Sequence, residues 1–307
     1  MPDLLQIGAV TDTMRDRMAA AFTIHQLDNF EPEKITHVVT NGHDGVNPDL
    51  MASLTNLRVI SGYGVGYDAV DAHEAARRGI IVTHTPNVLN QEVATTALLL
   101  MLACYREVLR DDAYARSGNW EAQGNAALTR SADNQTVGIL GLGRIGQAIA
   151  DKLAPWNCKI LYHSRNSKDV AYTYYDNLTA MARDCDVLIC ITPGGPATNK
   201  IVDAEVLDAL GPQGTLINVS RGSVVDEAAL ITALQNGTLG WAGLDVFERE
   251  PHIPQALRDL PNTVLLPHVG SATIETRAAM GALTVDNLLQ HLKDGTVISA
   301  VPECADI

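Results

Sequence analysis

Residues 136–146 read TVGILGLGRIG, and this stretch decides the fold of the second half of the chain. Its first five residues are mostly apolar or β-branched, which predicts a buried strand, and helical apolar spacing follows the glycines. The turn between them has the form G-x-G-x-x-G, made by Gly141, Gly143 and Gly146. Such a turn lets the backbone approach a pyrophosphate and brings the helix close to the strand. With a second predicted strand at 159–163, the pattern predicts a dinucleotide site at the helix N-terminus.

The end of the second strand indicates which dinucleotide is bound. Units that bind NAD place an acidic residue on the ribose about 20 residues beyond the glycines. Here the chain has Ser164, Arg165 and Asn166, and the next carboxylate is Asp169. An acid would repel a 2′-phosphate, whereas Arg165 can pair with it and its two neighbours can donate hydrogen bonds. The pattern favours NADP(H); the alternative is that Arg165 is a solvated loop cation.

Composition limits the class of protein. The chain has 307 residues, 46% of them hydrophobic, and a formal net charge of −14. This length suggests two domains, and the negative charge disfavours nucleic acid and anionic membranes as partners. No apolar run approaches the 18 or so residues of a membrane span, and the N-terminus lacks a signal-peptide pattern. The five cysteines and nine histidines show no metal-ligand or disulfide spacing, so we expect a cytoplasmic protein without a metal.

Strand and helix patterns alternate along the whole chain, which predicts an α/β fold. We expect two doubly wound parallel-sheet domains, a flavodoxin-like substrate domain (1–98 and 273–307) and a Rossmann coenzyme domain (99–272), with ligands in an interdomain cleft. A continuous helical run is predicted over 91–116, followed by a polar connector at 119–135.

Three predicted strands of the second domain end in polar residues. Arg221, Glu250 and His268 each follow one of these apolar segments. An arginine can hold a substrate carboxylate, a histidine can donate a proton to a keto oxygen, and a carboxylate can orient the imidazole. Singly, each has an ordinary alternative: Arg221 could pair with Asp226, Glu250 could be a solvated turn acid, and His268 could be structural. Together, beside a dinucleotide site, they indicate 2-keto acid reduction by hydride transfer.

Through these residues the chain resembles the D-isomer-specific 2-hydroxyacid dehydrogenase family. The matching motifs are the arginine motif at 218–222, D-V-F-x-x-E-P at 245–251, P-H-x-G at 267–270 and a glycine-rich loop at 61–68. The resemblance implies that Arg221, Glu250 and His268 are catalytic. It implies that substrate is bound by Tyr63, Gly64, Val65, Gly66, Arg221 and His268. The cofactor-binding residues expected from the turn and the resemblance are Gly141, Gly143, Arg144, Ile145, Gly146, Ser164, Arg165, Asn166, Thr192, Val219, Asp245 and Gly270.

Within the family, the stretches at 162–166 and 243–251 look most like NADPH-dependent glyoxylate/hydroxypyruvate reductases. The alternatives are a reductase of a bulkier keto acid, such as phenylpyruvate or 2-ketogluconate, and a non-catalytic nucleotide-sensing protein on the same scaffold. Formate oxidation is disfavoured because Glu250 stands where those enzymes carry glutamine. The resemblance also implies a homodimer joined through 91–135, in which Trp120 belongs either to an intersubunit arm or to a connector that caps a core.

Overall fold

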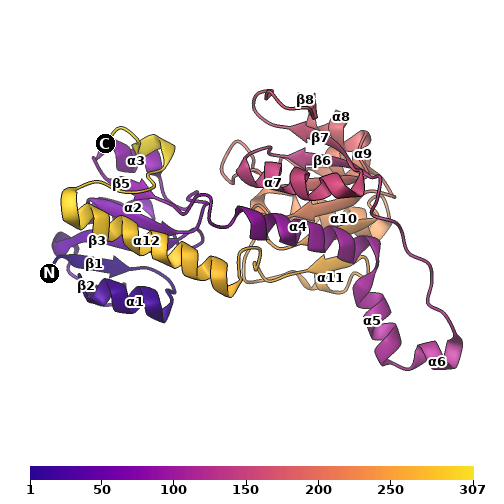
Figure 1. Ribbon diagram of the computed structural model, residues 1–307, viewed down its shortest axis with the longest axis horizontal. Coiled ribbons are helices and arrows are strands. Elements are labelled where there is room, and N and C mark those ends of the chain that lie inside the picture. Colours follow the sequence, from indigo (N-terminus) through magenta and orange to yellow (C-terminus); the bar gives the residue numbers. More distant parts are fainter. The chain divides into compact units, whose positions relative to one another are not determined.

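The computed structural model describes all 307 residues (Figure 1). The chain forms two compact units: unit 1 comprises Met1–Leu89 and Thr273–Ile307, and unit 2 comprises Asn90–Ala272. Each unit has its own sheet, and every strand pair in both sheets is parallel. The predicted fold class, two doubly wound α/β domains, is confirmed. The sequence-based division near residue 98 lies inside helix α4 (Asn90–Tyr105), all of which belongs to unit 2.

Unit 1 is built on a five-stranded sheet with the order β2-β1-β3-β4-β5, the flavodoxin-like arrangement. Its strands are β1 (Asp3–Gln6), β2 (Thr23–Gln26), β3 (Ile35–Asn41), β4 (Val59–Tyr63) and β5 (Ile81–Thr83). Its helices are α1 (Asp12–Ala19), α2 (Pro48–Ser53), α3 (Ala72–Arg77) and α12 (Ile274–Asp294), with short 3-10 turns at Pro32–Lys34 and Pro302–Cys304. Figure 1 shows α12 beside α1, and it packs on β4.

Helix α12 is tied to the sheet of unit 1 by polar contacts as well as by apolar packing. Ser61 on β4 donates its hydroxyl hydrogen to the backbone carbonyl of Thr284 at 2.8 Å, and Thr83 on β5 donates to Ser61 Oγ at 3.0 Å. All three residues are fully buried, so each hydroxyl needs such a partner. Val285 and Leu288 of the same helix lie in the apolar core of the unit. The last helix of the chain therefore completes the domain that the first residues begin.

Unit 2 is built on a seven-stranded sheet with the order β12-β11-β10-β9-β6-β7-β8. Its strands are β6 (Thr136–Leu140), β7 (Lys159–His163), β8 (Thr173–Tyr175), β9 (Val187–Cys190), β10 (Thr215–Asn218), β11 (Trp241–Leu244) and β12 (Thr263–Leu265). Its main helices are α4, α7 (Arg144–Leu153), α8 (Leu178–Arg183), α9 (Ala204–Leu210), α10 (Glu227–Asn236) and α11 (Gln255–Arg258). The strand order reverses between β6 and β9, and ligands of open α/β sheets bind at such a point.

The segment after α4 differs from the prediction. The single helix expected over 91–116 is two helices, α4 and α5 (Val108–Arg116), because Glu107 adopts a left-handed backbone conformation with φ of 42°. The expected connector at 119–135 contains a further helix, α6 (Asn119–Gln123). Figure 1 shows α5 and α6 extending away from the sheet of unit 2. No helix of the protein combines the length and the apolar character needed to cross a membrane.

A pair of histidines lies between the sheet of unit 1 and α12. His37 on β3 is only 2% exposed, and its Nε2 lies 3.0 Å from Nδ1 of His291 on α12. The other nitrogen of His37 lies 2.8 Å from Thr36 Oγ1. Burial lowers the pKa of His37 to about 4, and the nearby His291 and Arg58 act in the same direction. Burial also lowers the pKa of His291, with Arg58 adding to the effect and Asp294 opposing it.

This histidine pair predicts that the protein loses stability in mild acid. Between about pH 6.5 and 4 the unfolded chain binds a proton at His37 that the native state does not, so stability is complete above this window and falls as the pH falls through it. The pKa difference corresponds to about 3 kcal/mol. Urea unfolding at a series of pH values between about 6.5 and 4 measures this loss of stability. His37→Gln should flatten the dependence of the free energy of unfolding on pH. His73→Gln changes an exposed histidine and should leave that dependence as it is in wild type. An unchanged slope in His37→Gln would contradict the assignment.

Candidate functional site

The glycine turn of unit 2 has two crowded glycines and one open one. A Cβ added at Gly141, where φ is 103°, would lie 2.8 Å from the backbone nitrogen of Thr192, and one at Gly146 would lie 2.3 Å from Gly141 O. A Cβ at Gly143 would meet nothing within 4 Å. Gly143 is also the N-cap of α7 and supplies no side-chain cap. Gly141 and Gly146 therefore allow neighbouring backbone segments to pack closely. The space above Gly143 is open to a phosphate-bearing ligand at the helix N-terminus.

The remaining expected cofactor residues of unit 2 lie around this turn or at neighbouring strand ends. Arg144 and Ile145 open α7, before its first intrahelical hydrogen bond from Gln147 N to Gly143 O. Thr192 follows β9 directly beside Gly141, and Val219 N donates to Cys190 O at the end of β10. The arrangement fits a dinucleotide laid across the carboxyl ends of β6, β9 and β10. The nicotinamide ring of such a group would supply or accept hydride.

The loop after β7 holds the residues expected to select the cofactor. Arg165 and Asn166 are exposed. The hydroxyl of Ser164 donates to the backbone carbonyl of Asn166 at 2.7 Å, so it orders the loop in this structure. Tyr174 on β8 donates to Ser164 O at 3.3 Å, and Lys168 N donates to Tyr162 Oη at 2.8 Å. The strand β8, which the sequence analysis did not predict, thus supports this loop.

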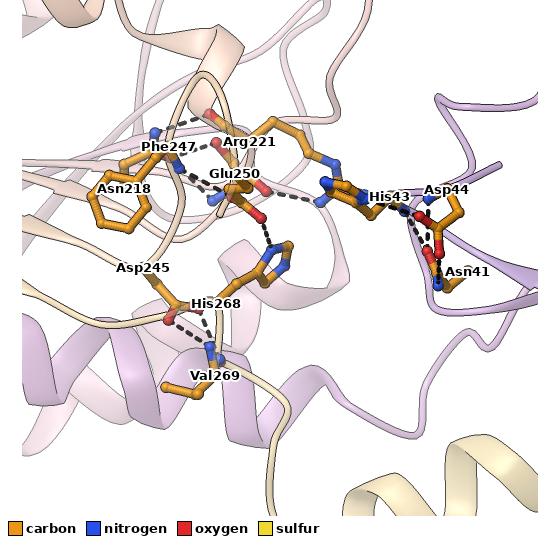
Figure 2. Close-up of polar contacts among 12 residues, drawn as sticks. Asn41, His43, Asp44, Asn218, Arg221, Asp245, Phe247, Glu250, His268 and Val269 are labelled. Atoms are coloured by element: carbon orange, nitrogen blue, oxygen red, sulfur yellow. Dashed lines mark hydrogen bonds and ion pairs between the residues drawn. The ribbon is translucent and has the colours of Figure 1, made fainter. Parts of the chain in front are cut away.

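The candidate acid/base pair of unit 2 is formed by His268 and Glu250 (Figure 2). His268 Nδ1 lies 2.6 Å from Glu250 Oε2, and Glu250 Oε1 accepts a hydrogen bond from the backbone amide of Phe247 at 3.0 Å. The glutamate side chain is 17% exposed and that of the histidine 45%. With Nδ1 held by the carboxylate, Nε2 is the ring nitrogen that can exchange a proton with a substrate.

The turn that carries His268 is held by a residue whose structural role the sequence analysis missed. Asp245 is 2% exposed, and its two carboxylate oxygens accept hydrogen bonds from the amides of Val269 at 2.7 Å and Gly270 at 2.8 Å. Its own carbonyl accepts from His268 N at 2.9 Å. Burial raises the pKa of Asp245, and the two amides lower it. These three bonds hold His268 at a φ of 53°, a conformation that costs energy in a non-glycine residue.

Arg221 is placed by a network at the end of β10 (Figure 2). Asn218 Nδ2 donates to the carbonyl of Arg221 at 2.9 Å, while Asn218 Oδ1 accepts from both N and Oγ of Ser220. A Cβ at Gly222 would lie 1.9 Å from the carbonyl carbon of Phe247, so only glycine permits the close packing of this loop on the one that precedes Glu250. Asp226, the alternative partner of Arg221, caps α10 and lies 3.5 Å from Lys200 Nζ.

The glycine-rich loop of unit 1 follows β4. The carbonyls of Gly64 and Val65 accept hydrogen bonds from Thr85 N at 2.8 Å and His84 Nδ1 at 3.0 Å. The amides of residues 64–66 donate to no acceptor in the chain. Tyr67, whose ring packs edge-on to His84 at a centroid distance of 5.6 Å, donates its hydroxyl hydrogen to Glu303 at 3.1 Å. The loop therefore presents several N–H groups from a fixed backbone, an arrangement suited to an anion.

The chain is similar in sequence to several known proteins. The sequence profile of the D-isomer-specific 2-hydroxyacid dehydrogenase NAD-binding domain matches residues 98–270. The chain is 42% identical to 2-ketogluconate reductase of Gluconobacter oxydans over 98% of both chains. It is 47% identical to glyoxylate/hydroxypyruvate reductase A of Arabidopsis thaliana, covering 87% of this chain and 85% of the relative.

A solved structure extends the comparison to the fold. The NADPH-dependent glyoxylate/hydroxypyruvate reductase of Sinorhizobium meliloti, crystallised with NADP and malonate, superposes with a TM-score of 0.94 at 43% identity. The match covers 99% of this chain and 97% of that one. The resemblance inferred from the motifs is thereby confirmed: the chain belongs to the D-isomer-specific 2-hydroxyacid dehydrogenase family.

Proposed function

We propose that the protein reduces a small 2-keto acid, glyoxylate or hydroxypyruvate, to the D-2-hydroxy acid with NADPH. The observation that carries this proposal is the 2.6 Å contact between His268 Nδ1 and Glu250, in the same unit as the open glycine turn. A proton donor held by a carboxylate is what reduction of a keto oxygen needs. Two of the relatives named above are glyoxylate/hydroxypyruvate reductases, which supports the same conclusion.

The proposed mechanism gives a defined role to each of these side chains. NADPH, held at the glycine turn at 141–146, would supply hydride to the keto carbon. Arg221 holds the substrate carboxylate and polarises the keto oxygen. In unit 1, the amides of the loop at 64–66 offer a binding site for a carboxylate. His268 gives its Nε2 proton to the oxygen as negative charge develops there. Glu250 fixes the ring orientation and stabilises the imidazolium, and Asp245 holds the turn on which the ring stands.

A bulkier substrate is the second candidate. Besides the 2-ketogluconate reductase, hydroxyphenylpyruvate reductase of Plectranthus scutellarioides is 44% identical, over 88% of this chain and 87% of the relative. Motifs that bind the carboxylate and the cofactor are compatible with either class, because they contact the part of the substrate that both classes share. Ranking kcat/KM for glyoxylate, hydroxypyruvate, 2-ketogluconate and phenylpyruvate with NADPH separates the two candidates.

His268 is expected to be essential for turnover. His268→Ala should lower kcat for glyoxylate by about 10²–10⁴-fold, the range for a general acid, while the Kd for NADPH changes little. Glu250→Gln should also lower kcat, because an amide does not stabilise the imidazolium. His252→Ala, an exposed histidine on the adjacent turn, is the matched control and should retain activity. If His268→Ala keeps nearly full turnover, another group supplies the proton and the mechanism is wrong.

Arg165 is proposed to select NADPH over NADH by pairing with the 2′-phosphate. Arg165→Ala should weaken NADPH binding by roughly 1.5–3 kcal/mol, the range for hydrogen bonds to charged groups, and leave NADH binding nearly unchanged. Fluorescence titration with each cofactor measures both values. Arg183→Ala, also an exposed arginine of unit 2, controls for the loss of one positive charge. Equal weakening for both cofactors would show that Arg165 does not contact the 2′-phosphate.

A homodimer is proposed because α5, α6 and the segment that follows α6 have apolar side chains that this chain does not cover. Helix α5 has no buried residue, Trp120 on α6 is 65% exposed, and Leu128 is 97% exposed. The exposure of Trp120 disfavours the alternative in which it caps a core of its own chain. Light scattering at micromolar concentration should give the dimer mass, and Leu128→Asp should shift it toward the monomer. A monomeric wild-type protein would refute the proposal.

The remaining expectations about partners and location also belong to this proposal. The net charge of −14 supports a small anionic substrate that reaches a local basic site, with no nucleic acid as partner. All five cysteines are free thiols, and burial raises the pKa of Cys104 and Cys185 to about 12. Unreactive buried thiols are compatible with the reducing cytoplasm, which is where we place the enzyme.

A further inference from the structure

Arg277 stands beside the glycine-rich loop of unit 1 with no task in the mechanism above. It lies near the start of α12 and is half-buried. Its guanidinium carbon lies 5.7 Å from the centroid of the Tyr63 ring, within the range of a cation–π contact. The Tyr63 hydroxyl donates to the backbone carbonyl of Arg277 at 3.2 Å. Tyr63 therefore contacts this arginine twice, through its ring and through its hydroxyl.

Tyr63 connects Arg277 to the anion-binding loop. It is the last residue of β4 and directly precedes the three residues whose amides have no acceptor in the chain. The carbonyls on the other side of that loop are already held by His84 and Thr85, so the orientation of the amides is fixed. Tyr63 thus connects two sources of positive potential in unit 1: the N–H groups of the residues that follow it in the chain, and the guanidinium near its ring.

The guanidinium of Arg277 has no carboxylate partner within the chain. By contrast, Arg15, Arg17 and Arg77 of the same unit each form an ion pair with an aspartate or glutamate. Acids outnumber bases in this protein, which has a net charge of −14, so such partners are abundant. A partly buried cation without a counterion loses hydration and gains no ion pair in return. An anionic ligand would provide that pair, and the planar guanidinium suits a carboxylate in particular.

We propose that Arg277, positioned by Tyr63, forms a second anion subsite next to the carboxylate-binding loop. It would take the far end of a 2-keto acid that carries a second carboxylate beyond the keto carbon. This inference rests on the proposed function, because it takes the loop at 64–66 as the binding site for the carboxylate of a 2-keto acid. It widens the substrate class from glyoxylate, which has no far end, to dicarboxylic 2-keto acids. Arg277 is then a specificity-determining residue that takes no part in hydride or proton transfer.

The kinetic test compares one substrate that reaches the subsite with one that cannot. In Arg277→Met, KM for oxaloacetate should rise about 10- to 100-fold, the loss expected for a hydrogen-bonded ion pair, while kcat/KM for glyoxylate stays within about 3-fold of wild type. Arg277→Lys keeps the charge but not the planar guanidinium, so its KM for oxaloacetate should lie between those of wild type and Arg277→Met. Arg77→Met removes an exposed arginine of the same unit and should affect neither substrate. Equal losses for both substrates, or none for oxaloacetate, would overturn the subsite.

A binding measurement separates this inference from the proposed reaction. Calorimetric titration of the full-length protein with succinate and with butyrate compares ligands of equal length that differ by one carboxylate. Wild type should prefer succinate, and Arg277→Met should lose that preference while Tyr63→Phe, which keeps the ring, retains part of it. If no 2-keto acid is reduced but the preference depends on Arg277, the proposed function fails and the subsite stands. If Arg277→Met binds succinate as wild type does, the subsite is refuted, whatever the enzyme reduces.

Discussion

The geometry of His268, the proposed proton donor, depends on one buried acidic residue, Asp245. The carboxylate accepts hydrogen bonds from the amides of Val269 and Gly270, and the backbone carbonyl of Asp245 accepts one from the amide of His268. Without these bonds nothing in the turn would favour a left-handed conformation at His268, and the ring would not meet Glu250. The carboxylate is desolvated, which raises its pKa, and the amides offset part of that cost. Asp245 therefore positions the proposed proton donor through the backbone, a role different from the cofactor contact that the resemblance implies for it.

A second principle of the structure is the local placement of positive charge in an acidic protein. The net charge of −14 repels anions at a distance, yet the substrate and the cofactor proposed here are both anionic. The positive groups are few and specific: the N-terminus of α7, the amides after β4, Arg221 and Arg165. Most of them are backbone groups or arginines at strand ends, where a fixed direction makes each one more effective than a mobile lysine would be.

The sequence predicts the fold well where a pattern is local. The glycine turn requires only neighbouring residues, so β6, the turn and α7 can be read directly from 136–146. The proximity of His268 to Glu250 is also foreseeable, because both follow strands that are neighbours in a parallel sheet. The break between α4 and α5 at Glu107 could not be predicted from the sequence. Helix α4 packs on the sheet whereas α5 extends away from it, and no local sequence pattern marks the end of α4. The role of Asp245 is hidden for the same reason: it depends on two loops that meet only in the folded unit.

The discontinuity of unit 1 has a consequence for biosynthesis. Unit 2 is one continuous segment, so all of its strands can pair once residue 272 has left the ribosome. Unit 1 cannot bury Ser61 until Thr284 has been translated, 223 residues later in the chain. Until then β4 exposes an apolar face that α12 will cover. Nascent chains therefore pass through a stage in which the coenzyme-type unit is folded and the amino-terminal sheet is incomplete, and this is the stage at which chaperones protect a chain from aggregation.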